Sequence, residues 1–198
     1  MLLSLVLPGS RRCQSFRGCE MIIIRLVRHD DPLSWGIIQN TGGVVSHAEA
    51  ILKGGTIIGA FAEGGVQERP LDYDGGKFLK EILFALPADD DMAARFEHYL
   101  RSPRVLGEPY DYPGIVNFTH PGWDLHAGHH VFCSDLIHLA LRGIGAAIDS
   151  PRWWPRPMPI PGHYVSPLLL HQELLCDQRT QIITRTDPVF LKHITASG

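Results

Sequence analysis

The sequence lacks several features that would assign it at once to a functional class. Its 198 residues include four cysteines, and no two form a Cys-x-x-Cys pair, which argues against an iron–sulfur site or a thiolate zinc ribbon. Lysine and arginine (18) do not exceed aspartate and glutamate (21), so the charge does not indicate a nucleic-acid partner. No apolar run approaches the ~18 to 20 residues of a membrane span. A soluble enzyme or a binding module remains.

The first twenty residues differ from the rest of the chain. A short apolar stretch, residues 2–7, precedes Arg11 and Arg12, whereas a secretory signal places its positive charge before a longer apolar region. We therefore expect residues 1–20 to be a leader outside the fold and residues 21–198 to form a single domain. The irregular cysteine spacing predicts free thiols in a reducing compartment, and thus a cytoplasmic protein.

The hydrophobic pattern of the remaining chain predicts both strands and helices. The expected strands cover residues 21–27, 44–52, 56–61, 66–71 and 181–184, and the expected helices cover residues 31–38, 89–100, 132–141 and 168–175. Residues 107–130 are rich in glycine, proline and histidine and are expected to form a long loop. Loops of this length inside a compact domain are often functional.

Two residues far apart in the chain carry the chemistry, Cys133 and His47. Cys133 stands where a helix is expected to begin, on the helix face that is expected to be buried. A thiol there lies near unpaired backbone N–H groups and the positive end of the helix dipole, both of which favour the thiolate. His47 lies within an expected strand and can take the thiol proton. This is the arrangement of papain-like thiol hydrolases, in which the thiolate attacks a carbonyl.

Four short motifs in a fixed order extend this similarity. Residues 46–50 (Ser-His-Ala-Glu-Ala), 107–111 (Gly-Glu-Pro-Tyr-Asp), 132–136 (Phe-Cys-Ser-Asp-Leu) and 166–167 (Ser-Pro) resemble motifs of the circularly permuted NlpC-type papain-like hydrolases, the YiiX-like group. The histidine precedes the cysteine here, whereas ordinary papain-like and NlpC enzymes place the cysteine first. The resemblance spans residues 21–175.

The resemblance implies a fold and an activity. The fold is α+β, with an antiparallel sheet packed against the helix that bears the nucleophilic Cys133. The activity is that of a cysteine hydrolase that acts on an amide (peptide) or an acyl ester or thioester bond through an acyl-cysteine intermediate, without a cofactor. The substrate would be a peptide or a lipid acyl donor, since the family contains both kinds of enzyme. The resemblance also suggests Tyr110 as an oxyanion donor beside the backbone N–H of Cys133.

The chain departs from the family at the residue that orients the histidine. Relatives carry a polar residue on the following strand, whereas the expected hairpin pairs His47 with Phe61 or Ala62, neither of which is polar. Glu49 shares the strand face of His47 and is our preferred orienting residue. Glu63, just past the expected position, and a water molecule remain open alternatives.

Two other functions compete with catalysis. The missing polar residue favours a catalytically idle relative that binds a peptide or lipid in the same groove. A cluster of three histidines, His126, His129 and His130, could instead hold zinc, although its spacing matches no standard zinc module. The oligomeric state does not follow from the sequence.

Overall fold

The computed structural model describes residues 20–116, 130–144 and 165–196. The expected leader, apart from Glu20, lies outside these residues, and so do His126 and His129 of the histidine cluster. In chain order, the elements of the described part are β1 (Glu20–Arg28), α1 (Pro32–Thr41), β2 (His47–Leu52), β3 (Thr56–Phe61), β4 (Gly65–Pro70), β5 (Lys80–Ala88), α2 (Asp90–Leu100), α3 (Tyr112–Val116), α4 (Cys133–Gly143), α5 (Pro167–Cys176), β6 (Gln181–Ile183) and α6 (Pro188–Thr195).

The strands of the described residues form one antiparallel sheet in the order β4-β3-β2-β1-β5-β6. β1 lies at its centre and pairs with β2 on one side and β5 on the other. Every residue of β1 from Met21 to Val27 is buried, because both faces of the sheet are covered. The fold is therefore α+β, as the sequence predicted.

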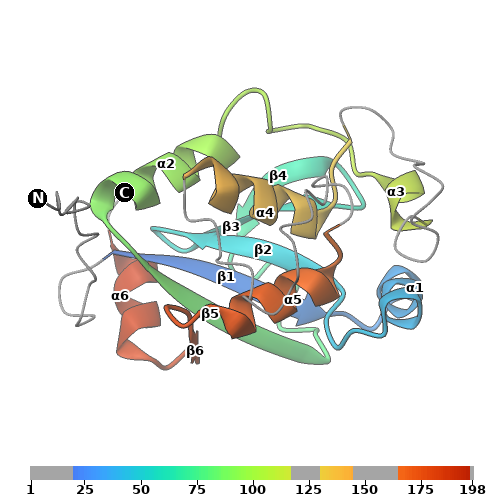
Figure 1. Ribbon diagram of the computed structural model, residues 1–198, viewed down its shortest axis with the longest axis horizontal. Helices are drawn as coiled ribbons and strands as arrows, with labels where there is room; N and C mark the ends of the chain where they lie inside the picture. The colour runs from blue at the N-terminus through green and yellow to red at the C-terminus, as the bar shows by residue number, and fades with distance from the viewer. Residues whose placement is uncertain (1–19, 117–129, 145–164, 197–198) are drawn as a thin grey trace, which may run out of the picture.

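Helices cover the two faces unequally. α2, α4 and α5 lie along one face and contribute to its larger apolar cluster, in which α4 packs on β2 and β3 (Figure 1). α6 packs on β1 and β2 from the other face, where Phe190 joins a smaller cluster with Ile23, Ile51 and Ile57. None of the helices in the described residues has the length and hydropathy needed to span a lipid bilayer.

Helix starts and stops follow the local sequence closely. Asp31 caps α1 by accepting a hydrogen bond from the backbone N–H of Ser34, and Pro32 occupies the first turn. Gly42 ends α1 in the left-handed conformation with φ 69°, which a side chain would disfavour. α4 begins at Cys133, and the predicted apolar stripe of that helix is buried, which confirms its amphipathic assignment.

The structure corrects two strand assignments. β2 begins at His47 rather than at residue 44, so His47 opens the strand instead of lying in its middle. β5 was missed by the sequence analysis, although it pairs with β1 along nine residue pairs. Its residues 82–86 form a continuous apolar run, because both faces are covered, and such a run lacks the alternation that marks a half-buried strand.

Candidate active site

His47 and Glu49 lie two residues apart on the same face of β2. Nε2 of His47 is 3.2 Å from Oε1 of Glu49, an ion-pair contact in which the ring N–H is not aligned for a hydrogen bond. The Glu49 side chain is fully buried, and the His47 side chain is 13% exposed. Because Nε2 faces Glu49, Nδ1 is the ring nitrogen left for a second partner.

Two hydrogen bonds hold the Glu49 carboxylate in place. Nη1 of Arg25 donates to Oε2 at 2.8 Å, and the Tyr73 hydroxyl donates to Oε1 at 2.5 Å. Across the hairpin stands Gly59, where a Cβ would lie 3.3 Å from the Glu49 side chain, so the glycine leaves it room. Burial on its own would raise the pKa of Glu49, but its interactions with His47 and Arg25 lower that pKa to about 2. Glu49 is therefore a carboxylate at neutral pH.

Arg25 connects Glu49 to a wider charged network. Its buried guanidinium also pairs with Asp74 at 2.6 Å and with Glu81 at 2.6 Å, and Glu81 pairs in turn with Arg185 at 2.7 Å. Burial on its own would lower the pKa of Arg25, but these carboxylates hold it above its ordinary value, so the side chain stays charged. Arg25 was not among the site residues predicted from the sequence. Its signal was a single charge inside the apolar run of residues 22–27.

Cys133 is the first residue of α4 and interacts with the imidazole of His47. Burial on its own would raise the pKa of the Cys133 thiol, but His47 and the backbone N–H groups of Ala48 and Ser134 lower it. Burial would likewise lower the pKa of His47, yet the Cys133 sulfur and then Glu49 raise it to about 10. The two shifts together favour a thiolate–imidazolium pair at neutral pH.

Tyr110 reaches the same site from the segment that follows α2. A bridge between Tyr110 and Val131 ties this segment to the start of α4. Gly65, at the start of β4, has φ 66° and lies so close to the Glu108 carbonyl that a Cβ would overlap it. Burial, followed by the charge of Cys133, raises the pKa of Tyr110, which also interacts with the sulfur through its hydroxyl. The structure thus brings Tyr110 beside Cys133.

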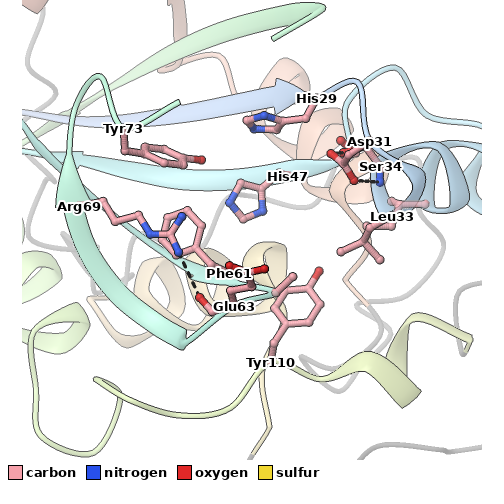
Figure 2. Close-up of a pocket in the computed structure, with 13 residues that line it drawn as sticks. His29, Asp31, Leu33, Ser34, His47, Phe61, Glu63, Arg69, Tyr73 and Tyr110 are labelled. Carbon is pink, nitrogen blue, oxygen red and sulfur yellow. Dashed lines mark hydrogen bonds between the residues drawn. The ribbon is translucent and has the colours of Figure 1, made fainter. Parts of the chain in front are cut away.

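An open cavity of about 270 Å³ lies beside His47 (Figure 2). His47 and Tyr110 both line it, whereas Cys133, of the described residues, is 1% exposed and does not. Cys133 therefore does not face the cavity, whereas His47 and Tyr110, which interact with its sulfur, do. Glu63, the alternative orienting residue, lines the cavity with an exposed side chain, and the carboxylate that contacts His47 is that of Glu49.

Two other side chains that could take part in chemistry, Ser134 and His130, stand close to Cys133 in the sequence. The Ser134 hydroxyl donates to the Val165 carbonyl oxygen at 2.6 Å, so it fastens α4 to the segment before α5. His130 is the member of the histidine cluster that the structure describes. Within the described residues, no group of three histidine, cysteine, aspartate or glutamate side chains could hold a metal ion.

The fold and this site define an α+β protein in which an imidazole lies between a thiol and a carboxylate. No family model matches the chain, and no curated protein sequence is significantly similar to it. Its fold is similar to that of the metalloprotein YiiX from Escherichia coli O157:H7, whose crystal structure superimposes with a TM-score of 0.58 at 14% sequence identity. The match covers 86% of this chain and 99% of that chain. The likeness shows a YiiX-like fold.

Proposed function

We propose that this protein is a cysteine hydrolase of the circularly permuted NlpC type, with Cys133 as nucleophile and His47 as general base and then acid. The observation that carries the proposal is the position of His47 between the Cys133 sulfur and the buried Glu49 carboxylate. Glu49 acts as a positioning residue, since it holds Nε2 while Nδ1 serves the sulfur. The bond cleaved is an amide or an acyl ester or thioester.

The proposed reaction has two steps. The Cys133 thiolate attacks the substrate carbonyl carbon, and the resulting oxyanion accepts hydrogen bonds from the Cys133 backbone N–H and the Tyr110 hydroxyl. The His47 imidazolium then gives a proton to the leaving amine, alcohol or thiol, which departs and leaves an acyl-cysteine. His47, now neutral, takes a proton from water, which attacks the acyl carbonyl and releases the acid and the thiolate.

A binding module is the second candidate, and the burial of Cys133 favours it. With Cys133 1% exposed, a substrate carbonyl reaches the sulfur only if a neighbouring side chain, such as Tyr110 or His47, moves aside on binding. A protein that binds peptide or lipid in the cavity without chemistry needs no such movement.

The metal-binding alternative would depend on His126 and His129 together with His130. The structural neighbour is a metalloprotein, but among the described residues of this chain no group of three suitable side chains could hold a metal ion.

Trapping an acyl-enzyme separates the first two candidates. The protein is mixed with peptide, thioester and lipid acyl donors, quenched in acid and digested, and the Cys133 peptide is weighed by mass spectrometry. A mass increase equal to the acyl group on Cys133, unchanged in a Cys176→Ser control, supports the hydrolase, because Cys176 is an exposed free thiol. Acylation of neither cysteine by any donor, with ligand binding intact, supports the binding module.

The thiolate–imidazolium pair makes its own prediction. At pH 6, iodoacetamide is expected to alkylate Cys133 at least about tenfold faster in the wild type than in His47→Ala, because the variant loses the charge that lowers the thiol pKa. The matched control is His138→Ala, which removes a histidine of α4 that contacts Glu173. Equal labelling rates in all three proteins would contradict the ion pair.

A further inference from the structure

The cavity beside His47 carries a cation that the proposed reaction does not use. Arg69 of β4 lines it, with its guanidinium carbon 3.8 Å from the centre of the Phe61 ring and 5.1 Å from that of Tyr73. Among the described residues, Arg69 makes one hydrogen bond, from Nη2 to the Glu63 backbone oxygen at 3.1 Å, and no carboxylate pairs with it. Figure 2 shows this guanidinium between Phe61 and the Glu63 carbonyl.

The position of Arg69 is fixed by its neighbours rather than by an ion pair. Two aromatic rings and one backbone carbonyl hold the guanidinium, so less conformational entropy is lost when a ligand binds to it. Two other buried or half-buried arginines of the described residues are already neutralised: Arg25 pairs with three carboxylates and Arg185 with Glu81. Arg69 thus offers N–H donors to an anion that the described residues do not supply.

Arg69 is also close to the reacting groups. The Phe61 ring that it covers lies 5.2 Å from the His47 ring, centre to centre, so His47 and Arg69 contact the same aromatic side chain. A molecule whose carbonyl lies beside His47 and whose carboxylate lies on Arg69 therefore needs only a short spacer between the two groups. The cavity of about 270 Å³ suits such a small molecule.

We infer that Arg69 forms a carboxylate subsite, so that the substrate is a small amide or ester carrying a carboxylate a few bonds from the bond that is cleaved. This inference rests on the proposed function and narrows its substrate class. A plain alkyl chain in the same place would bury the remaining N–H groups of the guanidinium without an acceptor, which is unfavourable. Of the peptide and lipid acyl donors considered above, the structure therefore favours an acidic peptide-like donor.

Equilibrium binding tests the subsite without requiring turnover. The probes are glutaramate, which has an amide and a carboxylate, and glutaramide, its neutral amide analogue, titrated by calorimetry into the full chain. The wild type is expected to bind glutaramate at least about tenfold more tightly than glutaramide, as a charge-assisted hydrogen bond implies. Arg69→Gln is expected to abolish this preference, and Arg69→Lys to keep part of it.

Three further variants make the result specific. Arg95→Gln removes an exposed arginine of α2 that pairs with Asp91 and is expected to leave the preference unchanged. Glu63→Gln removes one of the two carboxylates that line the same cavity, the other being Asp31, and is expected to strengthen glutaramate binding, because it removes a repulsion. Cys133→Ala is expected to keep the preference for glutaramate over glutaramide, because Cys133 does not line the cavity, so the binding result stands whether or not Cys133 is a nucleophile.

The opposite results would overturn the subsite. Equal affinity for the two probes, no binding of either at millimolar concentration, or the same loss in Arg95→Gln as in Arg69→Gln would each do so. Inorganic phosphate that binds more tightly than glutaramate would show that the site does not select a carboxylate. Failure of acyl trapping with the glutaramate preference intact would instead count against the hydrolase and leave the subsite standing.

Discussion

The two faces of the β1–β2 pair come from alternate residues of the same strands, yet they differ in chemistry. On the face that α4 covers, Leu26 and Ala48 pack in an apolar cluster. On the opposite face, Arg25, His47 and Glu49 stand next to one another and form ion pairs. One face needs only a covering layer, whereas the other needs a specific partner for each charge.

The ion pairs of the charged face fix the positions of side chains rather than add to the stability of the fold. Its two guanidinium groups, Arg25 and Arg185, face three carboxylates, Glu49, Asp74 and Glu81, so one negative charge is left over. A protonated His47 beside Glu49 adds one positive charge and the Cys133 thiolate adds one negative charge, so this excess remains. Buried ion pairs of this kind are often no more stabilising than apolar residues of the same volume. Their presence here is explained by what they hold, namely the carboxylate that contacts the imidazole.

The largest stability difference between the two faces is expected from Arg25→Met. The variant leaves Glu49 buried without its guanidinium partner, and breaking a buried ion pair costs about 3–5 kcal/mol. The control on the apolar face, Ile24→Val, removes one methyl group from a neighbouring buried position and is expected to cost about 0.5–1.5 kcal/mol. Urea unfolding at pH 7 measures both. Equal costs would show that the charged face is not more demanding than the apolar one.

The next prediction concerns the pH dependence of Glu49. Its pKa is lowered from 4.5 to about 2 on folding, so its contribution is fully present above pH 4.5 and is lost as the pH falls towards 2. The shift corresponds to about 3 kcal/mol. The free energy of unfolding of Glu49→Gln is therefore expected to fall below the wild-type value by roughly this amount at pH 7, and the gap is expected to close by pH 2.

Unfolding curves at a series of pH values provide the measurement for Glu49. Glu63→Gln serves as the control, because its exposed side chain at the cavity rim makes no ion pair among the described residues. That variant is expected to follow the wild-type curve at every pH. A gap between wild type and Glu49→Gln that stays constant from pH 7 to pH 2 would mean that Glu49 does not act through its charge.

The sequence predicted the apolar face better than the charged one, and the reason is physical. The stripe that buries Cys133 repeats every three or four residues along α4, so neighbouring positions in the chain reveal it. The charged network joins residues 24 to 104 positions apart, such as Arg25 with Glu49 and Arg185 with Glu81. No local period encodes such contacts. The motif order brought Cys133, His47 and Tyr110 together, but not the residues that hold Glu49.

The smallest expected effect on stability comes from Tyr73, whose half-buried hydroxyl is compared with the exposed hydroxyl of Tyr112. Tyr73→Phe removes the hydrogen bond to Oε1 of Glu49, and the loss of one such bond is expected to cost about 1 kcal/mol of stability. The control Tyr112→Phe removes a hydrogen bond to the Ala62 carbonyl from a residue that is 50% exposed, and water replaces it at a cost within about 0.5 kcal/mol.

The reactivity of Cys133 adds a second measurement for the Tyr73→Phe variant. If Tyr73 positions Glu49, its loss lets the carboxylate turn away from Nε2 of His47, so the rate of Cys133 alkylation at pH 6 is expected to fall together with the stability. A purely structural hydroxyl would lower the stability and leave that rate unchanged. In Tyr73→Phe, the loss of alkylation rate is therefore compared with the loss of unfolding free energy. A loss of both shows that the charged face positions the imidazole, whereas a loss of stability alone shows that it only stabilises the fold.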